Sequence, residues 1–281
     1  MKFRLSATVV FSAVIGYLLG VESLSLFAIS YLIIGGILVT GSANAFNQIL
    51  EQKHDKLMER TAQRPLPLGN LSSPQALVFA TLIGGIGLLA LYSVVPGGFK
   101  SCLFGVLSIL LYVLVYTPLK RISPIAIFVG AFPGAIPILL GWVAATNDFS
   151  LVAGVLFAVQ FCWQFPHFIA ISWVQDAEYK KAGFKMMYGG KKGKYPALIS
   201  IVASLFMTII SVIPFFWNYT DLTLSVYGAS SVFVLGIWFT LKSVKLYNNT
   251  DDKSALKVML SSFAYLPIMQ IIYVLDKFLM R

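Results

Sequence analysis

The chain has 281 residues, of which 58% are hydrophobic and only 11% are charged. Soluble domains usually have about 45–50% apolar and about 25% charged residues, so this composition excludes an ordinary cytosolic globular enzyme. Lys and Arg outnumber Asp and Glu by 21 to 11, while two Cys and two His argue against a disulfide framework or a zinc centre. The sequence therefore predicts a polytopic membrane protein.

Nine apolar runs approach the length of about 17–25 residues that a membrane-spanning helix needs. They lie at about residues 5–20, 25–50, 74–95, 99–117, 124–145, 150–173, 196–216, 223–241 and 255–275. The first run is short, and with Lys2 and Arg4 before it, it resembles a retained helix more than a removed signal peptide. We expect an all-α integral membrane protein with about nine transmembrane helices and a single domain over residues 1–281.

The basic residues are distributed asymmetrically between the two sides of this predicted topology. If the N-terminus is cytoplasmic, 18 of the 21 Lys and Arg residues fall in cytoplasmic segments. Because cytoplasmic loops are typically basic, we expect the N-terminus inside and the C-terminus outside. No Arg- and Ser-rich transit segment is visible, which favours a bacterial inner membrane. The chemistry is therefore expected at the cytoplasmic ends of the helices.

Corresponding residues recur at a fixed spacing along the chain. Pro74 and Pro196 are 122 positions apart, as are Lys120 and Lys242. Because four crossings return a chain to its starting side, this spacing predicts two related four-helix halves with the same orientation.

The second apolar run ends in acidic and amide residues with four-residue spacing. Asn47, Glu51 and Asp55 fall on one flank of a helix. Two carboxylates stacked near a membrane need a cation between them. Mg²⁺ commonly binds one or two carboxylates and completes its shell with water and substrate phosphates. The flank therefore predicts a magnesium site, with a solvated helix end as the alternative.

Four basic residues lie on the same expected side of the membrane: Arg60, Arg64, Lys120 and Arg121. Arginine suits planar, bidentate contact with phosphate oxygens. Together with the acidic flank they predict a diphosphate–Mg²⁺ site. Alternatively, each basic residue alone could serve as a topology determinant or contact lipid headgroups.

The sixth apolar run carries a polar stripe. Gln160, Gln164, His167 and Glu178 recur at helical spacing, so we expect this stripe to face a cavity, with Pro166 opening the helix beside it. A buried histidine can equally be a hydrogen-bonded core residue. The fifth run contains two prolines and several glycines and is expected to be interrupted, with kinked helices and close small-residue packing as the alternative.

Five segments together resemble one family. These are Asn47 to Asp55, the RTAQRPL stretch from Arg60, the YTPLKR stretch from Tyr116, Gly130 to Trp142, and WQFPHF from Trp163 with Glu178 to Gly183. In this order they are similar to the protohaem IX farnesyltransferase (haem O synthase) branch of the UbiA-type intramembrane prenyltransferases. The sequence departs from the wider superfamily at Glu51, where Asp is common. It departs again at Lys180, which stands where a DxxxD motif beginning at Asp176 would have its second Asp.

The resemblance implies a reaction and a role for each matching residue. Such enzymes bind farnesyl diphosphate and haem B as substrates, use Mg²⁺ to ionise the diphosphate, and join the farnesyl group to a haem vinyl carbon. The implied catalytic residues are Asn47, Glu51, Asp55 and Tyr116; the implied metal ligands are Glu51, Asp55, Asp176 and Glu178. The implied diphosphate contacts are Arg60, Arg64, Lys120 and Arg121, and the implied haem contacts are Gln164 and His167.

The resemblance also implies partners. Besides its two substrates and the lipid bilayer, we expect a downstream haem-modifying enzyme or haem-copper oxidase assembly, and no nucleic acid. Two rival functions remain open at this point. One is a prenyltransferase acting on a quinone precursor, and the other is a transporter of small anions, which broken helices and duplicated halves would suit.

Overall fold

The computed structural model describes residues 3–217 and 222–279, with side chains from residue 6 onwards. These ranges are helical and contain no strand, and Lys2 and Arg281, which entered the charge comparison, lie outside them. Eight helices are long and apolar enough to cross a membrane, and Ser6–Gly20 is a shorter apolar helix. The expected all-α, multi-pass membrane architecture is confirmed, including its short first helix.

The helices follow one another with short connections. The first part of the chain forms α1 (Phe3–Gly20), α2 (Leu26–Asp55), α3 (Glu59–Ala62), α4 (Pro65–Leu68), α5 (Ser73–Tyr92), α6 (Gly98–Leu110), the π-helix η1 (Leu111–Tyr116), α7 (Thr117–Leu119) and α8 (Ala126–Thr146). The second part forms α9 (Leu151–Val174), α10 (Asp176–Lys181), the 3₁₀ turn η2 (Tyr188–Gly190), α11 (Lys194–Ser211), the 3₁₀ turn η3 (Ile213–Phe216), α12 (Val226–Asn249) and α13 (Asp252–Leu279).

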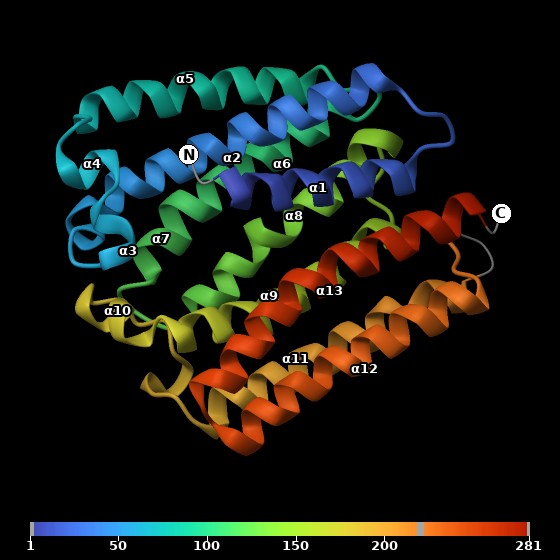
Figure 1. The fold of residues 1–281 in the computed structure, drawn as a ribbon. Coiled ribbons are helices and arrows are strands. Elements are labelled where there is room, and N and C mark those ends of the chain that lie inside the picture. The colour runs from blue at the N-terminus through green and yellow to red at the C-terminus, as the bar shows by residue number, and fades with distance from the viewer. Residues whose placement is uncertain (1–2, 218–221, 280–281) are drawn as a thin grey trace.

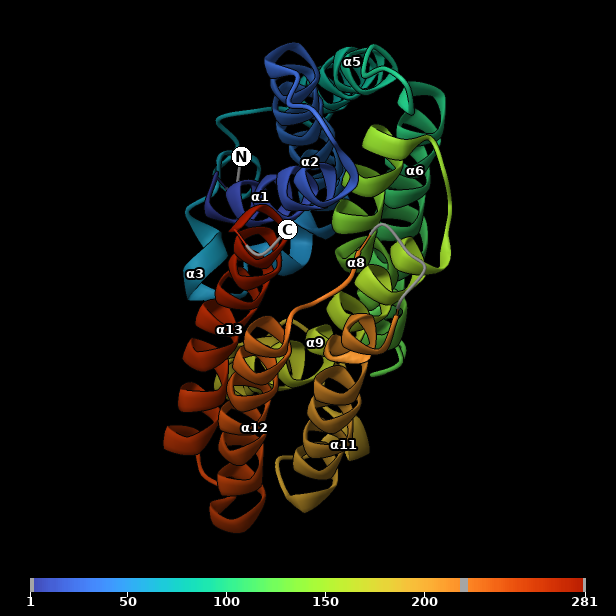
Figure 2. The same ribbon diagram turned by 90° about the vertical axis from the view of Figure 1, so that its right-hand side faces the viewer.

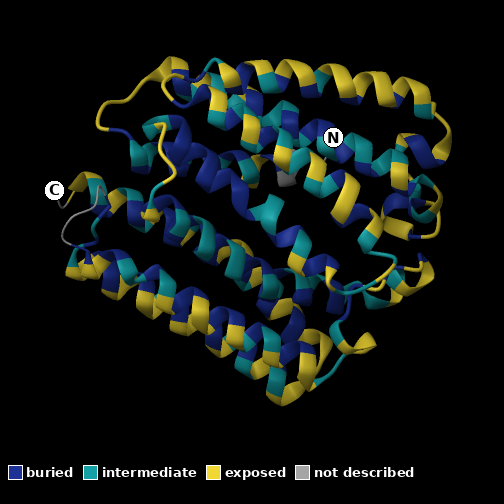
Figure 3. Ribbon diagram, turned by 180° about the vertical axis from the view of Figure 1, so that it is seen from behind, coloured by how far each residue is buried: buried dark blue, intermediate teal, exposed yellow. Residues whose placement is uncertain are grey.

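Helices α8 and α9 lie at the centre of the bundle. In the most apolar 18-residue stretch of α8, 72% of the residues are buried. The corresponding share in the other long membrane-spanning helices is 22–56%. Helices α1, α2, α5 and α6 pack on one side of this pair and α11, α12 and α13 on the other (Figures 1 and 2). Exposed residues follow the outer helices (Figure 3), as expected where lipid rather than protein covers the surface.

The order of elements is similar in the two parts of the chain. A long helix is followed by a loop with short helical turns, and then by a helix that carries a proline in its first turns, Pro74 in α5 and Pro196 in α11. This order accords with related four-helix halves, and the duplication itself stays a prediction.

The expected interruption of the fifth apolar run is wrong. Helix α8 continues from Ala126 to Thr146 with Pro133 and Pro137 inside it. Helix α9 likewise continues through Pro166. Prolines are tolerated in membrane helices where neighbouring helices and local adjustments satisfy the freed backbone groups, and both of these helices are enclosed by others.

The polar stripe of the sixth run is shorter than expected. Gln160, Gln164 and His167 lie buried on α9, but this helix ends at Val174. Glu178 belongs to the separate short helix α10, so its inclusion in the stripe was wrong. The reason is that the backbone of Gln175 leaves the α-helical conformation between α9 and α10, which helical spacing alone does not reveal.

Candidate active site

The loops after α2, η1 and α9 meet at one end of the bundle. We call this end, formed by residues 56–72, 120–125 and 175–193, the loop end (Figure 1). The backbone N–H of Glu59 donates to the Glu178 carboxylate at 2.7 Å, and that of Lys185 donates to the Lys120 carbonyl at 2.7 Å. His54 Nδ1 lies 2.8 Å from the carbonyl oxygen of Ala182. Contacts between distant loops thus assemble the residues that the sequence singled out.

An apolar cluster supports this assembly from below. Met58, Tyr116 and Phe184 are buried together, with further residues from α8 and α9. Met58 lies in the loop after α2, Phe184 in the loop after α9, and Tyr116 at the end of η1, so their packing holds these two loops against the end of η1. Burying such side chains stabilises the arrangement by about 1.5–3 kcal/mol each.

The acidic flank of α2 is a continuous helical surface. Asn47, Glu51 and Asp55 are 0%, 3% and 1% exposed. They lie within one helix that ends at Asp55, as their spacing predicted. The alternative of a solvated helix end is excluded, because a solvated end would expose these side chains.

Each buried carboxylate has a basic partner. Asp55 Oδ2 lies 2.6 Å from Arg64 Nη1, and Glu51 forms an ion pair with Lys120. All four side chains are at least four-fifths buried. Burial lowers the pKa of Lys120, and the adjacent Glu51 carboxylate opposes this shift. Because a buried carboxylate without a partner is costly, each pair compensates charges that the fold holds away from water.

The amide of Asn47 has a defined orientation. Its Nδ2 donates to Thr117 Oγ1 at 3.0 Å, while the single Thr117 hydroxyl proton goes to the Tyr112 carbonyl at 2.8 Å. Thr117 can therefore only accept from Asn47, which leaves Asn47 Oδ1 buried and without a partner among the described residues. Unpaired buried oxygens are rare. This one adds a third potential oxygen ligand for a metal ion to the two carboxylates.

These three donors fit a hard divalent cation. Mg²⁺ prefers oxygen ligands and needs only one or two carboxylates when substrate phosphates complete its shell. Among the described residues no group of three or more His, Cys, Asp or Glu side chains forms a metal cluster. A cation bound here would therefore depend on oxygens from a substrate as well as on the protein.

The second acidic pair belongs to α10, which contacts the loop after α2 through Glu178 and the backbone of Glu59. Asp176 pairs with Lys180 at 2.7 Å, and Glu178 pairs with Lys181 at 2.7 Å. The hydrogen bond from Lys181, followed by that from the Glu59 backbone, lowers the pKa of Glu178. In this arrangement both carboxylates bind lysines of their own helix, and their role as metal ligands stays a prediction.

The remaining basic residues differ in their surroundings. Arg60 is exposed on α3, where its charge opposes the rise in the pKa of Tyr179 that burial causes. Arg121 donates through Nη2 to the Leu50 carbonyl at 2.8 Å, so part of its guanidinium anchors the end of α2. Arg60 is thus the more available of the two to an incoming anion.

Aromatic rings connect this polar end to the polar part of α9. The Lys120 ammonium lies 5.0 Å from the centre of the Tyr116 ring, which is 6.4 Å from the Phe168 ring. Tyr116 is the last residue of the π-helix η1, and π-helical turns often occur at functional sites. A Cβ atom at Gly130 would lie 2.7 Å from the Tyr116 ring, so only glycine leaves room for the ring in this position.

The expected acceptor residues are buried on α9. Gln164 and His167 are 4% and 8% exposed, and Gln164 packs against Gly134 of α8. His167 Nδ1 lies 2.7 Å from Ser262 Oγ of α13. Sequence reasoning missed Thr117 and Ser262, the partners of Asn47 and His167. Thr117 stood inside the quoted YTPLKR stretch, whereas nothing in the sequence marked Ser262.

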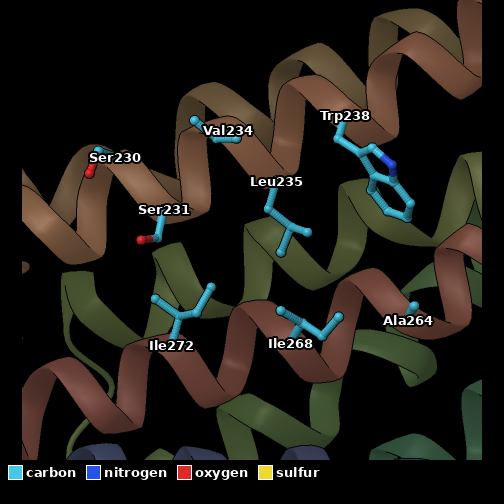
Figure 4. Close-up of a pocket in the computed structure, with 8 residues that line it drawn as sticks. All are labelled: Ser230, Ser231, Val234, Leu235, Trp238, Ala264, Ile268 and Ile272. Atoms are coloured by element: carbon cyan, nitrogen blue, oxygen red, sulfur yellow. The ribbon is translucent and has the colours of Figure 1, made fainter.

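A groove of about 720 Å³ lies between side chains of the neighbouring helices α12 and α13 (Figure 4). Trp238, Leu235 and Ile268 line it, and none of its eight lining residues is ionisable. It therefore supplies no charged side chain that could pair with a charged substrate, and the polar residues at the loop end remain the candidate site.

Comparison with known proteins agrees with this geometry. Residues 9–264 match the model of the UbiA prenyltransferase family. The chain belongs to this family. It is therefore an intramembrane prenyltransferase, and the resemblance found in the sequence is confirmed.

Three similar curated proteins carry the same name. A protein of Flavobacterium psychrophilum named protoheme IX farnesyltransferase is 47% identical to this chain, over 99% of the chain and 93% of the relative. A protein of Christiangramia forsetii with the same name is 44% identical, over 99% and 92%. The mitochondrial protein of this name from Arabidopsis thaliana is 34% identical, over 95% of this chain and 61% of the relative.

Solved structures share the fold at low sequence identity. A digeranylgeranylglyceryl phosphate synthase has a TM-score of 0.79 and 18% identity, with 96% of this chain and 93% of that chain covered. A UbiA homologue from Archaeoglobus fulgidus, bound to DMAPP and Mg²⁺, has a TM-score of 0.70 and 15% identity, with 98% and 97% covered. The UbiA-like architecture is thus confirmed.

Proposed function

We propose that this enzyme transfers a farnesyl group from farnesyl diphosphate to a vinyl group of haem B, giving haem O and diphosphate. The observation that carries the diphosphate part is the buried arrangement of Asp55 with Arg64 and Glu51 with Lys120. The acceptor is inferred from the name of relatives that match 99% of the chain. The product would pass to a haem-modifying enzyme or a haem-copper oxidase assembly.

Each site residue has a role in this reaction. Glu51, Asp55 and the free Asn47 Oδ1 would hold Mg²⁺, with Asp176 and Glu178 as the proposed second set. When bound, the cation neutralises charge that grows on the departing diphosphate. Arg64 and Lys120 then exchange their carboxylate partners for phosphate oxygens, and Arg60 and Arg121 stand beside them. Stabilising a leaving group in a water-poor site is often the largest catalytic contribution.

The aromatic ring of Tyr116 would stabilise the positive charge that forms on the farnesyl group. Breaking the carbon–oxygen bond leaves positive charge on the allylic carbons, and the Tyr116 ring offers a face that can stabilise it by about 0.5–2 kcal/mol. The vinyl group of haem B forms a bond to this carbon, which leaves positive charge on the inner vinyl carbon. Water adds there and loses one proton to solvent, which gives the hydroxyl of the hydroxyethylfarnesyl side chain. Gln164 and His167 would position the haem. The Phe168 ring contacts both His167 and Tyr116 and so lies between the proposed haem contacts and Tyr116.

We further propose that the loop end faces the cytoplasm of a bacterial inner membrane, with the N-terminus inside and the C-terminus outside. The support is the distribution of charge, since 18 of the 21 basic residues fall on that side of the predicted topology.

The function is tested by mass spectrometry of haems extracted from cells that lack their own haem O synthase. We expect haem O when the intact gene is expressed and a much smaller amount with the Asp55→Asn variant at equal protein level. If the well-expressed intact protein yields no haem O, the acceptor is not haem B. Extracts supplied with an aromatic quinone precursor would then show whether that class is prenylated instead.

We expect Mg²⁺ and diphosphate to bind the purified protein together rather than separately. Mg²⁺ alone must displace Lys120 and Arg64 and leave them buried without partners, which costs about 3–5 kcal/mol per broken pair. Diphosphate provides those partners. Thermal unfolding should therefore show a small shift with either ligand alone and a larger-than-additive shift with both.

Additive shifts would contradict this expectation. The control variant is Asp148→Asn, which removes a carboxylate charge in an exposed loop at the other end of α8. It should show the same thermal shifts as the wild-type protein with each ligand and with both.

A further inference from the structure

His167 is held by a hydrogen bond whose direction can be deduced. Its Nδ1 lies 2.7 Å from Ser262 Oγ, and Ser262 Oγ donates to the Met259 carbonyl at 2.6 Å. A serine hydroxyl has one proton, and a carbonyl oxygen can only accept. Since that proton goes to Met259, Ser262 accepts from His167. Nδ1 therefore carries the proton, and Nε2 carries the lone pair of a neutral imidazole.

Neighbouring side chains fix the plane of this ring. Trp163 stacks on it with centroids 4.5 Å apart, and Phe263 meets it edge-on at 4.9 Å. The Trp163 indole also donates to the Ser262 carbonyl at 3.0 Å, which holds α13 against α9 at this point. The imidazole is thus pre-oriented, so little conformational entropy is lost if Nε2 binds a ligand.

Nε2 is available to a bound molecule. Within the residues that the structure describes, no hydrogen bond involves Nε2. Nε2 is also not one of the fully buried polar atoms without a partner, so part of its surface is accessible. A neutral imidazole with a bound Nδ1–H and an open Nε2 is the arrangement of a metal-ligating histidine, because the outer hydrogen bond sets the tautomer and raises ligand basicity.

We propose that His167 Nε2 is an axial ligand of the iron of the haem substrate, and that Ser262 is its positioning residue. This inference rests on the proposed function, which makes haem B the acceptor. The ring of Phe168 lies 5.4 Å from His167 and 6.4 Å from Tyr116. An iron bound at His167 would thus place the porphyrin next to the aromatic residues that border the diphosphate site.

The direct test uses the full-length protein in lipid nanodiscs, labelled with ¹⁵N-histidine and loaded with ferric haem B. Electron–nuclear double resonance should detect coupling between the iron and one histidine nitrogen. The chain has only two histidines, so His54→Gln is the matched control and should keep the coupling. His167→Gln should lose it. Because coupling that persists in His54→Gln can only come from His167, a His167→Gln variant that fails to fold does not prevent a decision.

Ser262→Ala separates positioning from packing. Loss of such an outer partner typically weakens metal affinity by about 10–100-fold. We expect weaker haem binding together with a lower iron–histidine stretching frequency in the ferrous resonance Raman spectrum. An unchanged frequency would show that Ser262 does not act on the ligand.

The outcomes distinguish this inference from the proposed function. Bound haem without histidine coupling, coupling that persists in His167→Gln, or no haem binding at all would overturn the ligation. Haem O formation in cells together with any of these results would leave the farnesyl transfer intact. Coupling through His167 without haem O formation would support the ligation and reject the transfer.

Discussion

Asp55→Asn should lower kcat for diphosphate release by about 10²–10³-fold, the effect typical of removing one preorganised electrostatic group from an active site. Asp55 is 1% exposed, and its carboxylate lies 2.6 Å from the Arg64 guanidinium. It is therefore a proposed metal ligand that also orients a proposed phosphate contact. Asparagine preserves the volume and removes the charge. The measurement is diphosphate release by purified protein with farnesyl diphosphate and haem B.

Two variants show whether this loss is specific. Asp148→Asn makes the same chemical change in an exposed loop and should retain wild-type turnover. Arg64→Ala should reduce turnover by a similar order, and the double variant should lose less than the product of the single losses because the residues act as a pair. Near-wild-type rates in folded Asp55→Asn or Arg64→Ala protein would remove the proposed site.

Gly141→Val should strongly destabilise the folded protein. A Cβ atom at Gly141 of α8 would overlap the carbonyl oxygen of Ala13 in α1, and one at Gly16 would overlap that of Ile138 in α8. Because both obstacles are backbone atoms, the helices must separate rather than repack. We expect a cost at or above the upper end of the roughly 1–3 kcal/mol that overpacking usually causes.

The measurement is the thermal unfolding of detergent-solubilised protein. The readout is the fraction of heated protein that still elutes from a gel-filtration column as a single species. Gly85→Ala in α5 is the control, because nothing lies within 4 Å of a Cβ atom there. That change should be neutral or stabilising by about 0.5–1 kcal/mol, since alanine is the better helix former. Normal stability of Gly141→Val would contradict the close approach of α1 and α8.

The sequence by itself determined the membrane architecture and much of the candidate site. Long apolar runs must form helices in a bilayer, because no water is present there to satisfy a non-helical backbone. Helical periodicity also sufficed to place Asn47, Glu51 and Asp55 on one flank, and the structure has them on a single helix. Both conclusions depend on residues close in the chain.

Only the tertiary structure decided which partners these residues have. Asn47 and Thr117 are 70 positions apart, and His167 and Ser262 are 95 apart. Such pairs form only when particular helices pack side by side, and local periodicity carries no record of the neighbour. The continuity of α8 through its prolines has the same origin, because a membrane helix survives a proline where surrounding helices enclose it. The sequence thus determined which residues are polar and on which flank they lie. Helix packing decided that Oδ1 of Asn47 and Nε2 of His167 have no hydrogen-bond partner among the described residues.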